Sequence, residues 1–197
     1  MSPPLRLAVL ISGSGRTLAN FVDRIAAGTL PAQIACVICS KSGVPGIDVA
    51  RRANLPVELV PRRNFPDDAS FGDAIERALA PHSFDLAVLA GFIHHLPVSG
   101  RLRGRAINIH PALLPRFGGK GFYGERVHQA VLKAGDQESG CTVHWVDEQY
   151  DHGRIILQKR VPVLADDTAE TLAHRVFEAE CEAYPEALAL LAKEWKR

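Results

Sequence analysis

Short apolar runs alternate with amphipathic stretches through the first half of the chain. The runs are rich in valine, isoleucine and leucine without polar alternation, which is typical of strands buried on both faces of a parallel sheet. They predict five strands: Leu7–Ile11, Ile34–Ile38, Val57–Val60, Leu86–Leu89 and Ala106–Ile109.

The stretches between these strands carry apolar residues at the spacing of a helix with one buried face. They predict crossover helices over Leu18–Ala27, Ile47–Ala53 and Phe71–Ala80. Strands that alternate with helices predict an α/β fold, here a doubly wound, mostly parallel sheet with helices on both faces. Ligands of such sheets bind outside the carboxyl ends of the strands, so candidate chemistry is expected there.

The pattern changes in the second half of the chain. A glycine-rich loop, Gly118–Gly124, precedes a predicted helix over Val127–Ala134, and apolar runs predict strands over Cys141–Val146 and Ile155–Val163. No repeat or linker interrupts the sequence, so we expect a single domain of 197 residues with two halves, 1–105 and 106–197.

The last predicted element is a helix that runs to the C-terminal region. Asp167 is expected to cap it, with Glu170 three residues later completing a capping box. Pro185 falls inside this helix and is expected to kink it.

Composition narrows the class of protein. Hydrophobic residues make up 47% of the chain and charged residues 23%, as in ordinary globular domains. The formal charge is +1 and basic residues are scattered, so no nucleic-acid surface is expected. No apolar stretch is long enough to span a bilayer, and the chain starts almost directly with a strand, so we expect a cytoplasmic protein without membrane contact.

The cysteines do not predict a metal or redox site. Cys36 and Cys39 have an odd separation on a predicted strand, which places their side chains on opposite faces, and no second pair has ligand spacing. Cys141 and Cys181 are expected to be small buried hydrophobic residues. No metal is expected.

The first strand ends in a glycine-rich turn, Ser12–Leu18, that leads into a helix. Such a turn presents backbone N–H groups and the positive end of a helix dipole to an anion, which predicts a phosphate site. Leu18 replaces the third glycine of a dinucleotide fingerprint, so a mononucleotide-sized phosphate is favoured over NAD. The alternative is an ordinary tight turn of a doubly wound sheet.

Candidate catalytic side chains lie at the end of the fifth strand. Asn108 and His110 share one strand face, and Pro111 ends the strand. An amide and an imidazole side by side suit the binding of an oxyanion and the movement of one proton, as in acyl transfer. Asp151, in a later turn before Gly153, supplies a carboxylate that could orient His110 and stabilise its cationic form.

The fourth strand leads into a loop that contains Gly91 and two adjacent histidines, His94 and His95. Gly91 permits close approach of a flat ligand, and adjacent histidines cannot easily turn to one metal ion. We expect His94 and His95 to line a cleft. Three other histidines are expected to be structural: His128, His144 and His174.

At these residues the chain resembles the phosphoribosylglycinamide formyltransferases, which use 10-formyltetrahydrofolate. The resemblance runs nearly end to end and is strongest at Asn108–Pro115. Supporting stretches are Leu10–Gly15, Leu89–Phe92 and Asp151–Gln158. It implies transfer of a formyl group to the amine of 5-phosphoribosylglycinamide in de novo purine (IMP) biosynthesis, by a monomer or homodimer.

The resemblance also implies residue roles. Asn108 and His110 would flank the formyl carbon, with Asp151 supporting His110, and Glu180 would meet the glycinamide ribotide. The ribotide phosphate would be held by Ser14, Gly15, Arg16, Thr17 and Leu18. The pterin of the folate would lie along Phe92, Ile93, His94, His95 and Leu96 and along the turn that contains Asp147 and Tyr150.

The chain departs from the common family pattern at two kinds of position. Many members carry an arginine at the position of His94 and another near Asp68, and most have a shorter loop than Gly118–Gly124.

Alternative functions with related chemistry are those of a formyltransferase for another amine, such as a sugar nucleotide, and of a formyltetrahydrofolate hydrolase. A non-catalytic nucleotide or folate binder is the alternative of a different class.

Overall fold

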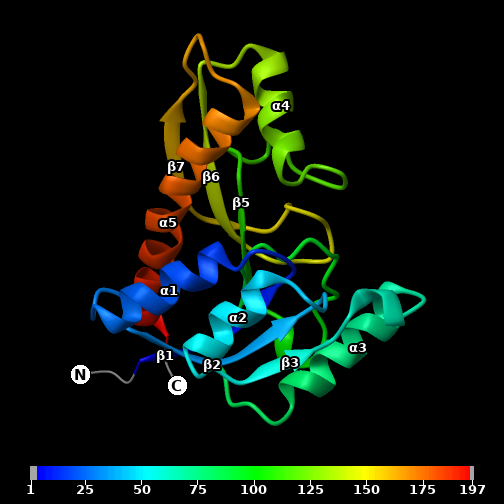
Figure 1. Cartoon of the computed structure of the whole chain (residues 1–197). Helices are drawn as coiled ribbons and strands as arrows, with labels where there is room; N and C mark the ends of the chain where they lie inside the picture. The colour runs from blue at the N-terminus through cyan, green and yellow to red at the C-terminus, as the bar shows by residue number, and fades with distance from the viewer. Residues whose placement is uncertain (1–3, 196–197) are drawn as a thin grey trace. The chain divides into compact units, whose positions relative to one another are not determined.

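The computed structural model describes residues 4–195 and contains seven strands and five α-helices within them (Figure 1). The strands are β1 (Leu5–Ile11), β2 (Ala32–Cys39), β3 (Val57–Leu59), β4 (Leu86–Leu89), β5 (Ala106–His110), β6 (Glu138–Trp145) and β7 (Ile155–Pro162). The α-helices are α1 (Arg16–Ala26), α2 (Pro45–Arg52), α3 (Asp68–Leu79), α4 (Glu125–Ala134) and α5 (Ala169–Glu194).

The seven strands form one sheet in the order β3-β2-β1-β4-β5-β6-β7. Strand β1 pairs in parallel with β2 and β4, whereas β6 and β7 pair antiparallel. The predicted doubly wound, mostly parallel sheet is therefore confirmed. The strand order reverses between β1 and β4, which is where ligands of such folds bind.

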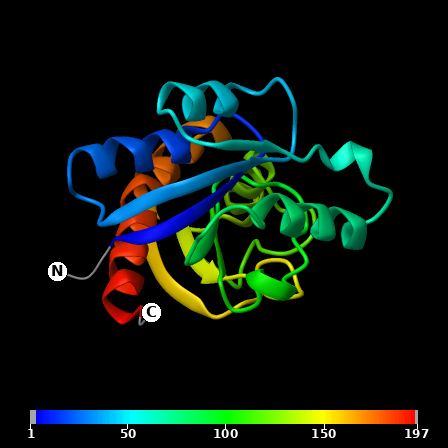
Figure 2. The ribbon, with the colours of Figure 1, turned by 90° about the horizontal axis from the view of Figure 1, so that it is seen from below.

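The chain divides into two compact units, one of residues 4–107 with 188–195 and one of residues 108–187. In the first unit, α1 and α2 cover one face of β1 and β2, and α3 covers the other (Figure 2). Strand β1 is almost wholly buried, which explains its uninterrupted apolar sequence. The second unit holds the β6 and β7 pair, α4 and most of α5. The expectation of one domain in two halves remains a prediction.

The first turn of α5 differs from the sequence prediction. The helix begins at Ala169, and Thr168 accepts the backbone N–H of Thr171 at 3.2 Å while the Thr171 hydroxyl accepts the N–H of Thr168 at 2.9 Å. Thr168 and Thr171 thus form the reciprocal cap that sequence analysis assigned to Asp167 and Glu170. The helix continues past Pro185, which is buried, to Glu194.

Asp167 instead anchors the helix through an ion pair. Its two carboxylate oxygens accept from Arg175 at 2.6 and 2.9 Å and it also accepts the backbone N–H of Leu164 at 2.8 Å. The Arg175 guanidinium is the main cause of a pKa for Asp167 well below its usual range. The bidentate contact fixes α5 against the segment that precedes it.

Asp167→Asn is expected to lower the free energy of unfolding by about 1 kcal/mol at neutral pH, since it breaks a bidentate but partly solvated pair. A lowered folded-state pKa means that this stabilisation is present above the unfolded-state pKa of about 4 and is lost as the pH falls below it. Urea unfolding across this range should therefore show the two proteins converging in acid. Asp73→Asn, at an exposed carboxylate on α3, is the matched control; an equal loss there would contradict the assignment.

No helix within residues 4–195 is long and apolar enough to cross a membrane.

Candidate active site

The turn after β1 has the geometry of an anion site. Gly15 has a positive φ of 74° and precedes α1, whose N-terminus has no side-chain cap and no acidic residue in its first turn. A Cβ on Gly15 would lie 2.6 Å from the Cα of Gly46, so only glycine fits there. Ser14 and Arg16 are exposed, whereas Leu18 is fully buried and can contribute only backbone. The turn offers backbone N–H groups and a nearby guanidinium to an anion.

Ser12 joins the ends of three strands in the first unit. Its hydroxyl lies 2.6 Å from that of Ser40, after β2, and accepts the backbone N–H of Ile93, after β4, at 3.2 Å. Its own N–H donates to the carbonyl of Gly91 at 3.1 Å. Gly91 has a φ of 73°, in the left-handed region that glycine adopts without strain. The phosphate turn and the loop after β4 are therefore neighbours.

The side chains of the loop after β4 differ in exposure. Phe92 and Leu96 are buried, while Ile93 is 54% exposed. The His94 ring stands edge-on to the rings of Phe92 and Phe71, with centroids 5.8 Å away in each case. Burial lowers the pKa of His94. A ligand could meet the Ile93 side chain and the loop backbone, but His94 is held by aromatic packing.

His95 is also engaged, since its Nδ1 lies 3.4 Å from a carboxylate oxygen of Asp68. Asp68 in turn accepts from Arg62 at 2.9 Å. Arg62, which lies between β3 and α3, thus brings a cation next to Asp68.

The second unit brings the three predicted catalytic residues together. His110 Nδ1 lies 3.3 Å from one carboxylate oxygen of Asp151, and Asn108 Nδ2 lies 3.5 Å from the other. The side chains of His110 and Asp151 are only 4% and 9% exposed. Because 43 residues separate Asn108 from Asp151, this contact is a product of the fold.

His144 is a fourth member of the cluster, although sequence analysis expected it to be structural. Its Nε2 lies 3.3 Å from Asn108 Nδ2 and 3.6 Å from Asp151 Oδ1. Its Nδ1 lies 2.9 Å from the carbonyl oxygen of Trp145, which can only accept, so Nδ1 carries a proton. In the neutral ring Nε2 then accepts from the Asn108 amide, whereas in the cationic ring it donates to the Asp151 carboxylate.

Asp151 is held as a carboxylate. Burial alone would raise its pKa, but hydrogen bonding from His144, the charge of His110 and the N–H of Gly119 at 3.0 Å hold the pKa below its usual value. Its φ of 53° is unusual for a residue other than glycine. Nearby, a Cβ on Gly153 would collide with the carbonyl oxygen of Trp145. The turn therefore needs glycine at position 153 to place the carboxylate of Asp151.

The donor nitrogen of His110 is occupied in this structure. Nε2 lies 2.8 Å from the carbonyl oxygen of Phe117, which can only accept, so Nε2 carries a proton. Nδ1 faces the Asp151 carboxylate, so the two contacts together suit the cationic ring. Burial lowers the pKa of His110, while the Asp151 carboxylate and the Phe117 carbonyl raise it, and burial prevails. The Asp151 carboxylate thus favours the cationic form of His110, as expected. The net effect on the pKa of His110 is nevertheless a lowering, which favours the neutral form.

The chain between His110 and Phe117 is anchored at its centre. The Thr142 hydroxyl donates to the carbonyl of Ala112 at 2.6 Å and accepts the N–H of Leu114 at 3.0 Å. Gln158 Nε2 donates to the carbonyl of Leu114 at 3.0 Å. These bonds hold the turn after β5 rigidly up to residue 114.

The remaining predicted site residues of the second unit lie outside this cluster. Asp147 accepts the N–H of Gln149 at 2.9 Å and lies 3.0 Å from His152 Nδ1, and Tyr150 is 40% exposed. Glu180 is half-buried on α5. Burial, with a contribution from the charge of Glu180, raises the pKa of Cys141 to about 12. Within the described chain, no group of three or more His, Cys, Asp or Glu side chains is arranged to hold a metal ion.

Comparison with known proteins agrees with this geometry. Residues 5–188 match the family model described as formyl transferase. A phosphoribosylglycinamide formyltransferase of Haemophilus influenzae is 40% identical over 91% of this chain and 84% of its own length. The trifunctional purine biosynthetic protein adenosine-3 of Gallus gallus is 41% identical over 95% of this chain, which spans only 18% of that protein.

A solved structure extends the likeness to the fold. The crystal structure of glycinamide ribonucleotide transformylase 1 from Symbiobacterium toebii superposes with a TM-score of 0.89 at 36% identity, covering 98% of this chain and 90% of the other. The match to the family model covers nearly all of the described residues. The chain therefore belongs to the formyl transferase family.

Proposed function

We propose that the chain transfers the formyl group of 10-formyltetrahydrofolate to the amine of 5-phosphoribosylglycinamide, a step of de novo purine biosynthesis, in the cytoplasm. The observation that carries the proposal is the buried cluster of Asn108, His110 and Asp151, in a chain that resembles phosphoribosylglycinamide formyltransferases over most of its length. An amide and an imidazole beside a carboxylate supply what acyl transfer to an amine needs.

The reaction begins when the amine attacks the formyl carbon, which forms a C–N bond and places negative charge on the formyl oxygen. Asn108 and His110 would stabilise this oxyanion as donors. Both donors have protein acceptors in this structure, so each would exchange its acceptor for the oxyanion. The contacts of Asn108 are long, at 3.3 and 3.5 Å, and are readily given up. His110 must leave the Phe117 carbonyl.

Collapse of the intermediate breaks the bond from the formyl carbon to the folate nitrogen. The attacking amine loses one proton and the departing nitrogen gains one, so the proton balance closes within the two substrates. Asp151 remains a carboxylate because of its lowered pKa, and it orients His110. The proton would pass through His110 or through a water held by Asp151.

The other predicted residues keep their proposed roles. Ser14, Gly15, Arg16, Thr17 and Leu18 would bind the phosphate, largely through backbone N–H groups. Folate would meet the loop from Phe92 to Leu96, and the turn with Asp147 and Tyr150. Glu180 would bind the ribotide, and the protein would act as a monomer or homodimer without nucleic acid or membrane partners.

The test is to mix the protein with 10-formyltetrahydrofolate and follow the absorbance of the deformylated folate, with and without phosphoribosylglycinamide. Turnover that depends on the acceptor supports the proposal. Equal release without acceptor would support a hydrolase. If deformylated folate is released only when a sugar-nucleotide amine is supplied, that amine would replace the proposed acceptor. Folate binding without any release of deformylated folate would support a non-catalytic binder.

A further inference from the structure

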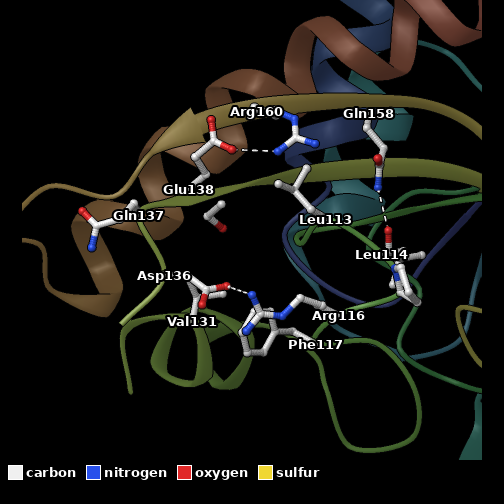
Figure 3. A pocket seen from close by; sticks show the side chains of 12 residues that line it. Leu113, Leu114, Arg116, Phe117, Val131, Asp136, Gln137, Glu138, Gln158 and Arg160 are labelled. Atoms are coloured by element: carbon white, nitrogen blue, oxygen red, sulfur yellow. Dashed lines mark hydrogen bonds and ion pairs between the residues drawn. The ribbon is translucent and has the colours of Figure 1, made fainter. Parts of the chain in front are cut away.

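The second unit contains a pocket of about 450 Å³ that the proposed reaction does not use (Figure 3). This volume lies within the range of pockets that bind small molecules. Its walls come from the turn after β5, from α4 and the start of β6, and from β7. The lining residues that matter below are Leu113, Arg116, Phe117, Val131, Ser139 and Arg160.

The pocket lining includes an unpartnered polar group. Ser139 is 2% exposed, and its hydroxyl has no hydrogen-bond partner among the described residues. A buried hydroxyl without a partner is unfavourable, so buried polar groups nearly always find one. A hydroxyl or carbonyl of a bound molecule would satisfy Ser139.

The mouth of the pocket carries charged side chains that form ion pairs with one another. Arg116 pairs with Asp136 at 2.6 Å, and Arg160 pairs with Glu138 at 2.7 Å, as Figure 3 shows. The two arginine side chains are 62% and 63% exposed, which places them at the opening. Leu113, Phe117 and Val131 give the interior apolar walls. A charged ligand would find no unpaired countercharge inside, so an uncharged ligand is favoured.

Phe117 connects the pocket wall to the catalytic cluster. Its side chain lines the pocket, while its carbonyl oxygen accepts from His110 Nε2 at 2.8 Å. Its φ of 56° lies in the left-handed region, which is strained for phenylalanine. The turn is anchored by Thr142 up to Leu114, so any change of conformation is confined to the residues that follow.

We propose that this pocket binds a small uncharged molecule with a compact apolar body and one hydroxyl or amide group, and that its occupation inhibits formyl transfer. The hydroxyl or amide pairs with Ser139. A ligand favours the conformation that it binds. Here that conformation is the one in which the Phe117 carbonyl holds the donor of His110. The inhibitory effect, but not the binding, rests on the proposed function.

Binding is tested by calorimetry with three probes that share one ring, namely benzyl alcohol, benzoate and benzylamine. Benzyl alcohol is expected to bind most tightly. Ser139→Ala is expected to weaken its binding about tenfold through the loss of one buried hydrogen bond. Val131→Phe, which fills the pocket, is expected to abolish binding, and Val131→Leu serves if that variant does not fold. Ser70→Ala, at a serine outside the pocket, is the matched control.

Failure of all three probes, or binding that Val131→Phe and Ser139→Ala leave unchanged, would overturn the site. In the formyl-transfer assay, benzyl alcohol is expected to lower kcat without raising the KM of either substrate. Competition with a substrate would overturn the proposal, because the pocket would then be part of the substrate site. If the protein lacks formyl transfer, the calorimetric result still decides whether the pocket binds.

Discussion

Asn108→Ala is expected to lower turnover in formyl transfer by about a hundredfold to a thousandfold, the usual cost of removing one oxyanion donor. The amide of Asn108 is oriented by His144 and Asp151, so a donor is in place before the substrate arrives. Because the negative charge on the formyl oxygen develops only in the transition state, kcat should fall while KM changes little.

The measurement is steady-state kinetics of the purified variant, with its circular dichroism spectrum and melting temperature compared with those of the unsubstituted protein. Asn64→Ala, which removes an exposed asparagine in the first unit, is the matched control and should leave turnover unchanged. Asn108→Ala with near-native kcat in a folded protein would rule out the oxyanion role.

Alternation along β5 is sufficient to predict that the side chains of Asn108 and His110 lie on one face, because side chains two apart on a strand share a face. The same rule applies to Thr142 and His144 on β6. The position of β6 beside β5 in the sheet, however, depends on pairing between distant segments, which the local pattern does not reveal. His144 was therefore assigned a structural role although it contacts Asn108 and Asp151.

Backbone partners of the cluster were beyond prediction for another reason. The carbonyl of Phe117 and the N–H of Gly119 contact His110 and Asp151 through groups that every residue carries, so no residue type marks them.

The bounds of the buried strands, in contrast, could be predicted from the sequence. Strand β4 has the predicted bounds, and β1 differs only at its start, because continuous apolar runs specify burial on both faces.

Helix starts were less predictable than strands, because several residues compete to cap them. Asp67 caps α3 by accepting the N–H of Ser70 at 2.7 Å, so the helix begins three residues before the apolar period suggested. At α5 a pair of threonines took the cap while Asp167 bound Arg175. A short polar side chain near a helix start has more than one possible partner, and tertiary contacts decide among them.

Asp151→Asn is expected to lower kcat by about a hundredfold or more, within the range for loss of a group that supports proton transfer. An amide can still accept the N–H of Gly119, so the turn around residue 151 should keep its conformation. It cannot supply a negative charge to His110. Asp73→Asn, at an exposed carboxylate on α3, is the matched control.

A second readout of Asp151→Asn separates an electrostatic role from a structural one. The Asp151 carboxylate raises the pKa of His110 against the effect of burial, so its removal should lower that pKa further. An NMR titration of the His110 ring in the two proteins measures the change directly. Full activity of the folded variant would remove Asp151 from the mechanism. Lost activity with an unchanged pKa of His110 would show that Asp151 acts only by holding the conformation of the turn. A loss of activity together with a lower pKa would assign the carboxylate its role through His110, the group that must leave the Phe117 carbonyl to reach the oxyanion.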